Sequence, residues 1–573
     1  MKRPIDGRVS LVISITGHRD LERDDYRDLE KEVGKILEKL QAKYPNTPLL
    51  LLSGLAEGAD RIAVYAAQRL RNPVPYVAVL PLPAAIYRED FAKQSSNDEF
   101  DELLKNADQC IELPLDEQFE PGEIEKAGQA RDAHYANLGR YLVQYSQLLI
   151  AIWDGNRLAK TGGTSHVVAM KLREEPPTDF RESGWMNWNG SGPVYVLPAR
   201  RVHSKQSMPP ALKIEVRCPE GSTWEDYDAS YKLLDLFNRE PTKPGWNLSE
   251  KIKRSRTYLF EGAEAIGLTD RMEWVATVYA KADALAIRYA NYSLWLWRLV
   301  FVLAAASGIA LAVHEGGDSG TGIFLAAYGG CFLCALVLMA LEPIARLRRR
   351  HEDYRALAEA LRVQFFWMAA GIPDIAAEQY LPKQYGEMAW IRDAISECVL
   401  CTPARHGNHP LRLRLAHQWV KGQASYFSRT FRRHGLKEKR LAAFAYAASA
   451  IGILAPFASL AGYEFARAGW MGPSAAPWEP SVSHMAAAIG LWCGALAWHY
   501  IERRGFKQEA RQYARMYELF HEADRVLESL ERAKDWRASE DTIRALGREA
   551  LEESGEWLSM HRERKLRLDD VTG

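Results

Sequence analysis

The stretch Leu11-Val12-Ile13-Ser14-Ile15-Thr16-Gly17-His18-Arg19 decides the fold of the first part of this 573-residue chain. Its first five residues are almost wholly apolar, which is typical of a strand buried on both faces of a parallel sheet. A glycine ends the run and polar residues follow it, as they do where a strand leads into a loop. The stretch therefore predicts a buried strand with polar side chains at its carboxyl end.

Short apolar runs of the same kind recur along the first two hundred residues, and charged stretches with helical spacing separate them. Alternating strands and helices imply right-handed crossovers and a doubly wound parallel sheet, whose ligand crevice lies beyond the carboxyl ends of the strands. We therefore expect an α/β Rossmann-like fold at the N-terminus. The further strands are expected at 49–52, 76–80, 110–113, 148–152 and 194–197, and the helices at 21–40, 57–70 and 123–145.

Glycines, hydroxyl-bearing residues and charged residues collect at the ends of these expected strands. Glycine lets the backbone approach a ligand closely, and the amides at a helix N-terminus favour a phosphate group. The sequence therefore predicts a binding site for a phosphorylated small molecule of the nucleotide type. Its residues are Thr16, Gly17, His18 and Arg19 after the first strand, Ser53, Gly54, Glu57, Gly58 and Asp60 after the second, Pro81 after the third, Asp154 and Gly155 after a later strand, and Gly162, Gly163, Thr164 and Ser165 at the start of the next helix.

Four of these motifs together resemble the SLOG superfamily, a Rossmann-like group that includes the cytokinin-activating phosphoribohydrolases and the DNA-processing protein A domain. They are GHR at 17–19, SGLAEGAD at 53–60, AIWDG at 151–155 and GGT at 162–164, and the resemblance covers about residues 8–205. It implies that the GGT loop binds phosphate and that the first two loops surround a ribose or a base. The helix that carries Arg131 and Tyr135 shares the resemblance, which adds these two residues to the expected ligand-binding set.

One departure from the family pattern concerns catalysis. The phosphoribohydrolases resemble PGGxGTxxE, whereas this chain reads Thr161-Gly162-Gly163-Thr164-Ser165-His166-Val167-Val168 and lacks the glutamate. We therefore expect a binding domain rather than an enzyme, with no catalytic residue and no required cofactor, although Glu57, Asp60 and Asp154 remain alternatives as acid or base. No metal site is expected either, because Cys398 and Cys401 have the spacing of half a zinc site without a second pair.

The second half of the chain contains four apolar runs, at 294–313, 322–341, 441–462 and 485–498. A helix needs about 20 apolar residues to cross the roughly 30 Å of hydrocarbon in a bilayer. Buried helices of a soluble core are the alternative, but they are rarely apolar on all sides over such a length. The runs predict an all-α membrane region with four transmembrane helices in two hairpins.

The distribution of charge gives an expected orientation. Basic residues follow the first hairpin and flank the second, whereas the two connecting loops carry few of them, so we expect the hairpin tips outside and both termini in the cytosol of an inner (cytoplasmic) membrane. Over the whole chain Lys+Arg and Asp+Glu are both 74, so bulk charge gives no attraction to nucleic acid. The basic residues are Arg346, Arg348, Arg349, Arg350, Arg429, Arg432, Arg433, Lys437, Lys439, Arg440, Arg503, Arg504 and Lys507.

A charged helix is expected after each hairpin, and the two helices carry a tyrosine and a glutamate at the same spacing. Tyr354 and Glu359 after the first correspond to Tyr513 and Glu518 after the second at a constant offset, which indicates an internal repeat. The segment 354–362 with Trp367 resembles the SLATT group of membrane domains, which are found beside SLOG domains in bacterial conflict systems. The expected organisation is a SLOG-like domain at 1–210, a linker and helix at 211–290, hairpin 1 at 291–345, a cytosolic helical region at 346–440, hairpin 2 at 441–502 and cytosolic C-terminal helices at 503–573.

These observations predict a cytosolic sensor of a nucleotide-derived second messenger, either NAD-derived or cyclic, joined to a four-span membrane effector. The resemblance implies antiphage defence, in which the effector oligomerises and disrupts the membrane. The expected partners are a small-molecule nucleotide, the lipid bilayer, further copies of the chain and a signal-producing enzyme encoded nearby, with no nucleic acid. The alternatives are a membrane-anchored nucleotide hydrolase of the phosphoribohydrolase type and a ligand-gated channel or transporter.

Overall fold

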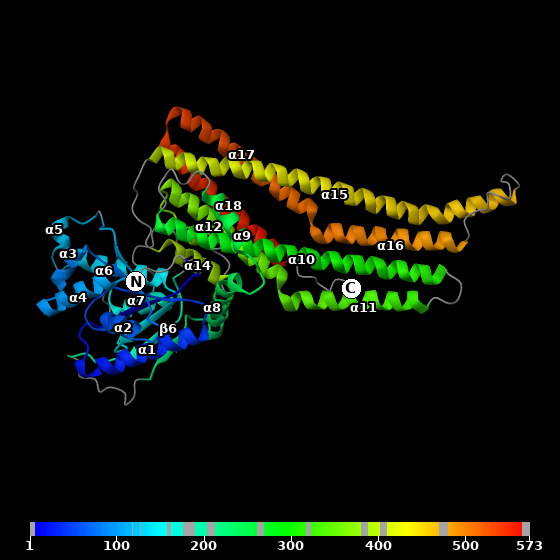
Figure 1. Cartoon of the computed structure of the whole chain (residues 1–573). Helices are drawn as coiled ribbons and strands as arrows, with labels where there is room; N and C mark the ends of the chain where they lie inside the picture. The colour runs from blue at the N-terminus through cyan, green and yellow to red at the C-terminus, as the bar shows by residue number, and fades with distance from the viewer. Residues whose placement is uncertain are drawn as a thin grey trace. The chain divides into compact units, whose positions relative to one another are not determined.

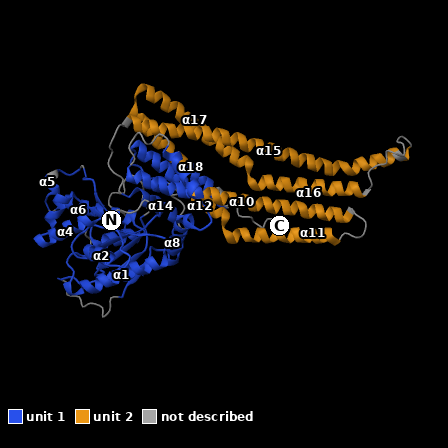
Figure 2. Ribbon diagram, in the orientation of Figure 1, with its two compact units in different colours: residues 1–284, 355–408, 551–563 blue, residues 285–354, 409–550, 564–573 orange. Residues whose placement is uncertain are grey.

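The computed structural model of this chain describes residues 6–116, 118–126, 128–156, 162–175, 190–202, 213–260, 269–316, 322–379, 388–400, 409–468 and 480–563 (Figure 1). The chain divides into two compact units, each assembled from separate stretches of sequence (Figure 2). Unit 1 comprises residues 1–284, 355–408 and 551–563, and unit 2 comprises residues 285–354, 409–550 and 564–573.

Among the described residues of unit 1, seven strands form one sheet in the order β4-β3-β2-β1-β5-β6-β7. Strands β1 to β6 all run parallel to one another, and β7 is antiparallel to β6. This confirms the expected Rossmann-like sheet and places its topological switch point between β1 and β5. The strands are β1 Leu11–Gly17, β2 Leu49–Ser53, β3 Tyr76–Leu80, β4 Gln109–Glu112, β5 Leu148–Trp153, β6 Val194–Pro198 and β7 Glu215–Arg217.

Successive residues of each central strand are buried on opposite faces of the sheet. Leu11, Ile13 and Ile15 of β1 join a core formed with the helices that follow β1, β2 and β3, whereas Val12 packs with Leu138 on the opposite face. This double burial explains why the strands read as continuous apolar runs. The helices that pack around the sheet are α1 Tyr26–Lys43, α2 Ala59–Gln68, α3 Ala84–Tyr87, α4 Gln94–Asn106, α5 Pro121–Ile124, α6 Gln129–Tyr145 and α7 Thr164–Lys171, with the 3₁₀ turns η1 Arg23–Asp25 and η2 Arg88–Asp90.

The segment 211–290, expected to be a linker and a helix leading to the membrane, contributes to the α/β core. It contains β7, helix α8 Trp224–Arg239, the 3₁₀ turn η4 Glu240–Thr242 and helix α9 Ser249–Phe260. Tyr231 of α8 is buried in the core and donates a hydrogen bond of 3.1 Å to the carbonyl of Gln147. Pro241, Pro244 and Gly245, which are residues typical of a linker, lie in and after η4, directly beyond the end of α8.

Unit 1 also takes in residues from between the two hairpins. Helices α13 Ala376–Gln379 and α14 Ala389–Val399 belong to it, and Leu400 packs against Val12 and Leu50 of the sheet. The carboxylate of Glu397 in α14 accepts a hydrogen bond of 3.0 Å from the indole of Trp274. The expected cytosolic helical region at 346–440 is therefore divided between the units, and its middle part completes the fold of unit 1.

Four helices within the described residues are long and apolar enough to span a membrane. They lie in Asp270–Glu315, Gly322–Ala370, Pro410–Phe465 and Ser481–Ala533, so each expected apolar run is helical. The tips at 317–321 and 469–479 lie outside the described residues. The long helices are α10 Asp270–Gly316, α11 Gly322–Ala345, α12 Leu347–Ala370, α15 His409–Arg467, α16 Pro480–Arg504, α17 Phe506–Ala533 and α18 Trp536–Glu563.

The two hairpins end in the same way. Arg346 separates α11 from α12 with φ +49°, and Gly505 separates α16 from α17 with φ +61°. Each residue lies eight positions before the tyrosine that marks the repeat, Tyr354 or Tyr513. In both breaks the carbonyl of the left-handed residue accepts the amide four residues later, from Arg350 or Glu509. The offset deduced from the sequence thus also relates two backbone breaks.

The packing between helices of unit 2 depends on small residues. A Cβ atom added to Gly490 of α16 would lie 2.6 Å from the backbone nitrogen of Gly452 of α15, so these backbones touch directly. Helices α10 and α16 also pack together, because the indole of Trp492 fills the space beside Gly308 and donates a hydrogen bond of 2.9 Å to the carbonyl of Ala304. Close approach at small residues is the usual way in which membrane helices associate.

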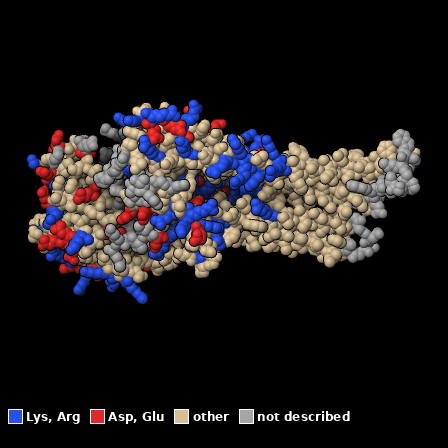
Figure 3. All heavy atoms as spheres, turned by 45° about the horizontal axis from the view of Figure 1, so that its top comes forward, with Lys and Arg blue, Asp and Glu red and all other residues tan. Residues whose placement is uncertain are grey.

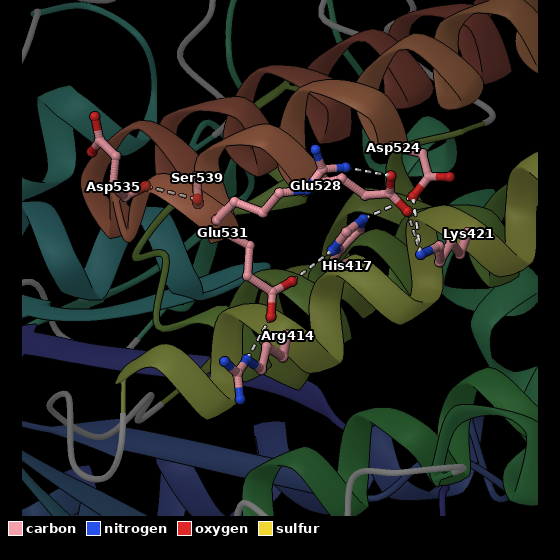
Figure 4. A network of polar contacts seen from close by, with 9 residues as sticks. Arg414, His417, Lys421, Asp524, Glu528, Glu531, Asp535 and Ser539 are labelled. Atoms are coloured by element: carbon pink, nitrogen blue, oxygen red, sulfur yellow. Dashed lines mark hydrogen bonds and ion pairs between the residues drawn. The ribbon is translucent and has the colours of Figure 1, made fainter.

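A polar network links the N-terminal part of α15 to the C-terminal part of α17 (Figure 4). The two ring nitrogens of His417 lie 2.8 Å from the carboxylate of Asp524 and 3.4 Å from that of Glu531. Glu531 also accepts a contact of 2.6 Å from Arg414, and Lys421 donates a hydrogen bond of 2.7 Å to Glu528. This charged part of α15 contrasts with its apolar part, which has the composition of a span.

Candidate functional site

The expected site residues converge at the carboxyl ends of the strands, on both sides of the switch point. His18 follows β1 and Asp154 follows β5, and the Nε2 atom of His18 lies 3.0 Å from a carboxylate oxygen of Asp154. Burial opposes the ionisation of Asp154, but its hydrogen bonds with the amide of Asn156 and with His18 outweigh burial and lower its pKa. The carboxylate is therefore charged at neutral pH and holds the imidazole at the edge of the crevice.

Arg19 and Arg131 lie on the two sides of Asp90, which belongs to the turn after α3. Arg131 is 2.8 Å from this carboxylate and Arg19 is 3.8 Å from it, and burial raises the pKa of Asp90 against the effect of both arginines. The guanidinium of Arg19 also lies over the ring of Tyr135, 5.1 Å from its centroid. The side chain of Arg19 is 40% exposed, so it can reach a ligand.

Arg131 is engaged differently. Its guanidinium donates hydrogen bonds to the carbonyls of Ile124, Glu125 and Ile86, in addition to its pair with Asp90. The residue is only 7% exposed. Arg131 therefore ties the loop after β3 to the start of α6, and its donors are largely used by the protein itself.

Two tyrosine hydroxyls at this edge have unmet hydrogen-bonding capacity. Tyr87 at the end of α3 and Tyr135 of α6 have ring centroids 6.2 Å apart. Among the described residues neither buried hydroxyl has a hydrogen-bond partner. Burial raises the pKa of Tyr87, so its hydroxyl is a neutral donor. A buried hydroxyl without a partner is unfavourable, and a polar ligand that reaches the pair would remove that penalty.

Asp60 at the start of α2 is a further acidic residue at this edge of the sheet. Burial raises its pKa to about 6, against the lowering effect of the amides of Ala56 and Gly54 and of Arg19. Gly58 brings this loop against the first one: it has φ +76°, and an added Cβ would lie 2.5 Å from the carbonyl oxygen of His18. The two glycine-containing loops therefore pack together and place Asp60 and Arg19 within electrostatic range of each other.

The GGT loop lies against α6 before it starts α7. A Cβ added to Gly162 would be 2.8 Å from the backbone nitrogen of Ala136, next to Tyr135. The amide of Gly162 donates a hydrogen bond of 3.2 Å to Nδ1 of His166, whose pKa is lowered by burial. Gly163, Thr164 and Ser165 then form the start of the helix and are partly exposed. The first turn of α7 thus lies near Tyr135, where its dipole favours an anion.

Several expected site residues make contacts within the protein. Ser53 is fully buried and accepts the amide of Leu55, which holds the turn after β2. Glu57 accepts a hydrogen bond from the hydroxyl of Ser96, which itself accepts one from Arg61. Thr16 and Pro81 are buried at the ends of their strands, and Gly17 packs against Ala59. Gly155 adopts φ +83° in the turn that follows Asp154.

Sequence reasoning did not place Tyr87 and Asp90 in the ligand-binding set, although both belong to the stretch that carries the family resemblance. They lie in a short helix and a 3₁₀ turn after β3, whose residue pattern has no phosphate-binding glycine. The position of this segment in the sequence could have identified it. It follows a parallel strand, so it begins at the same edge of the sheet as the other loops.

A separate cavity of about 200 Å³ lies at the opposite, amino edge of the sheet. It is lined by residues that include Gln147, Tyr227, Ser230, Arg392 and Asp393. Burial raises the pKa of Asp393 to about 6 and lowers that of the nearby Lys171 to about 7. The ammonium of Lys171 is fully buried and donates hydrogen bonds to the carbonyls of Val143 and Ser146.

No family model matches the chain, and no curated protein matches it.

Proposed function

We propose that the carboxyl edge of the sheet binds a phosphorylated, nucleotide-derived small molecule, and that this binding controls a membrane effector formed by the four apolar helices. The phosphate would lie between the first turn of α7 and Arg19, and the rest of the ligand would reach Tyr87 and Tyr135. Asp154 and Asp60 offer acceptors for ribose hydroxyls, which is a common use of acids at strand ends.

One observation carries this proposal: two buried tyrosine hydroxyls, without hydrogen-bond partners among the described residues, lie beside a partly exposed arginine at the switch point of a doubly wound sheet. Buried polar groups are otherwise satisfied in folded proteins, so such a pair marks a place where a ligand completes the hydrogen bonding. The location agrees with the general rule for open α/β sheets, whose ligands bind at the switch point.

The test is calorimetric titration of the full chain in detergent with cyclic mono- and dinucleotides, NAD and ADP-ribose. Tyr87→Phe and Tyr135→Phe remove hydroxyls that have no hydrogen-bond partner in the described part of the chain, so we expect weaker binding, by roughly tenfold each, with an unchanged melting temperature. The matched control is Tyr76→Phe, because the Tyr76 hydroxyl donates to the carbonyl of Leu103. That variant should melt lower and bind equally well. Unchanged affinity in both site variants would contradict the assignment.

The effector part of the proposal is tested separately with the full chain reconstituted into dye-loaded vesicles. The helices supply enough apolar length to perturb a bilayer, and a ligand can shift their arrangement only if it binds one state better than another. We expect dye release to rise with the concentration of the nucleotide that binds in calorimetry. Release that is the same with and without nucleotide would refute sensing while leaving the binding site intact.

A membrane-anchored nucleotide hydrolase is the second candidate, and the contact between His18 and Asp154 favours it. A carboxylate that orients an imidazole at 3.0 Å is an arrangement found in general bases. Prolonged incubation of the purified chain with the same nucleotides, followed by chromatography, separates the two functions. Products that disappear with His18→Gln would support hydrolysis, whereas recovery of intact nucleotide supports a sensor.

A further inference from the structure

The cavity at the amino edge of the sheet is large enough for a small-molecule ligand. Its walls come chiefly from α8, α13 and α14 and from the chain just before β5, and the described residues that line it all belong to unit 1. A cavity of roughly 150 Å³ accommodates benzene, so the volume of about 200 Å³ is enough for a molecule the size of an amino acid or a short amine.

Asp393 of α14 places a carboxylate in the wall of this cavity. Charged side chains normally lie on the surface, as the many Lys, Arg, Asp and Glu side chains in Figure 3 do. Burial raises the pKa of Asp393 to about 6, so its carboxylate is still largely ionised at neutral pH. It accepts a hydrogen bond from the side chain of Gln147, whose Oε1 accepts the amide of Val12 at 2.7 Å. These two contacts fix the carboxylate and leave it a further lone pair for a ligand.

Ser230 of α8 adds a hydroxyl with unmet hydrogen-bonding capacity. The residue is 3% exposed and lines the cavity, and its Oγ has no hydrogen-bond partner among the described residues. Tyr227 and Tyr231, one turn before Ser230 and directly after it, are both within electrostatic range of Asp393. Ser230 and Asp393 therefore belong to the same part of the wall, where α8 packs against α14. A buried hydroxyl without a partner is unfavourable, and a ligand that reaches it removes that penalty.

The charges and rings around the cavity favour a cationic ligand. Among the described residues that line it, acids outnumber bases: the acids are Glu220, Asp226, Glu378 and Asp393, and the bases are Arg173 and Arg392. The rings of Tyr227 and Tyr231 also line the cavity, and aromatic rings attract cations. No group of His, Cys, Asp and Glu in the described part of the chain is arranged to hold a metal ion. The cation that fits is therefore an organic one.

We propose that this cavity binds a small organic amine, whose ammonium group donates hydrogen bonds to the carboxylate of Asp393 and to Oγ of Ser230. An ammonium group has three donors and no acceptor, so it matches two acceptors in one wall. Its bond to the carboxylate is charge-assisted and therefore the stronger of the two. The ligand contacts α8 and α14 together, so it holds part of the segment between the two hairpins in unit 1. Binding here does not depend on the nucleotide site at the opposite edge of the sheet.

The experiment is calorimetric titration of the full chain in detergent with two amines, putrescine and benzylamine. A third titration uses 1,4-butanediol, which has nearly the shape of putrescine but no charge. We expect putrescine to bind at least about tenfold more tightly than butanediol, because only putrescine forms a charge-assisted hydrogen bond. Equal affinity for the two would overturn the assignment in favour of a neutral hydroxylated ligand. Absence of binding by both amines would also overturn it.

Two substitutions test the residues. Ser230→Ala should weaken putrescine binding by roughly tenfold without lowering the melting temperature, because the hydroxyl has no hydrogen-bond partner in the described part of the chain. Asp393→Asn keeps the shape of the side chain and removes its charge, so it should weaken binding further, by roughly a hundredfold. Unchanged affinity in Ser230→Ala and Asp393→Asn would place the amine elsewhere and contradict the proposal.

Each substitution has a matched control. Ser255→Ala removes a buried hydroxyl that donates a hydrogen bond of 2.6 Å to Asp283, so this variant should melt lower and bind putrescine as the native chain does. Asp541→Asn removes an acid of α18 that is 61% exposed, and it should leave putrescine binding unchanged. A loss in Asp541→Asn equal to that in Asp393→Asn would show that surface acids attract the amine without a specific site, and would overturn the proposal.

Discussion

At the scale of single residues, the sequence predicted which loops meet at the carboxyl edge of the sheet, but not which contacts each side chain makes there. Arg19 and Arg131 read alike in the sequence, because both belong to motifs that carry the family resemblance. In the structure Arg19 is partly exposed over Tyr135, whereas Arg131 is buried and bonded to three carbonyls. That difference depends on how the loop after β3 folds back on α6, which no local pattern in either segment encodes.

Alanine substitutions should therefore separate these two arginines. We expect Arg19→Ala to raise the nucleotide dissociation constant by one to two decades with little change in melting temperature, because it removes charge-assisted hydrogen bonds to phosphate, worth roughly 1.5–3 kcal/mol each. Arg131→Ala should instead lower the free energy of unfolding by about 3 kcal/mol, because it leaves Asp90 buried without its closest cation. Calorimetry and thermal unfolding of the full chain measure the two effects. Equal effects of both substitutions on affinity would contradict this division.

Lys171 gives a residue-scale prediction about stability and pH. Burial lowers its pKa from 10.5 to about 7, so between these values the unfolded chain binds a proton that the folded chain has released. Stability should rise with pH across that interval, by about 1.4 kcal/mol per pH unit for this one group, and the gain is lost again as the pH falls from 10.5 to about 7. Asp393, whose pKa is raised to about 6, is ionised throughout the interval and does not change the sign.

The measurement is thermal unfolding of the full chain in detergent at several pH values between 7 and 10. Lys171→Met should remove the part of the rise that comes from this lysine, whatever its effect on stability at a single pH. A control is Lys232→Met, which removes a lysine with a side chain that is 65% exposed. A pH dependence that survives unchanged in Lys171→Met would show that another group causes it.

At the scale of elements, the apolar runs predicted the buried strands and the spans because each signal repeats over the length of its element. Strand β7 gave no such signal, since its three residues are largely exposed and pair antiparallel at the edge of the sheet. The apolar part of α10 was predicted, and its charged beginning falls in the segment 211–290, where a helix was expected. The burial of that beginning was not predicted, because it depends on neighbours from distant parts of the sequence. The left-handed backbone at Arg346 and Gly505 shows that the repeat extends to the backbone conformation, whereas the sequence indicated it only through matching side chains.

The contact between α15 and α16 gives a prediction at this scale. A side chain at Gly490 would meet the backbone of Gly452 and the carbonyl of Ala448, at 2.6 and 2.7 Å, and neither can move aside as a flexible side chain could. Gly490→Leu should therefore force the helices apart and destabilise the second hairpin by on the order of 3 kcal/mol. Gly330→Leu in α11 is the control, because no atom of the described residues lies within 4 Å of its added Cβ. Thermal unfolding in detergent measures both, and equal melting temperatures would contradict the close packing.

At the scale of the whole molecule, the sequence predicted an α/β part and a membrane part but not how the chain is shared between them. Unit 1 is built from three separate stretches, and the chain passes from one unit to the other within α10, within α12 and within α18. A hydropathy pattern is read along the sequence, so it assigns consecutive residues to the same domain and cannot show which distant segments pack together. The residues 389–400 join unit 1 through side chains such as Leu400, whose burial depends on partners more than three hundred positions earlier.

The last prediction concerns the orientation of the whole molecule in a membrane. Basic residues lie after the first hairpin and on both sides of the second, so the positive-inside rule places the tips outside and the remainder of the chain in the cytosol. Single cysteines at Ser319 and Ser474, in a variant without the seven natural cysteines, should react with an impermeant thiol reagent added to intact cells. A cysteine at Ser249, which is exposed at the start of α9, should react only after the cells are opened. Ser53 would be a poor control because it is fully buried. Labelling at Ser249 in intact cells together with protection of both tips would reverse the orientation, and would move the proposed nucleotide site to the outside of the cell.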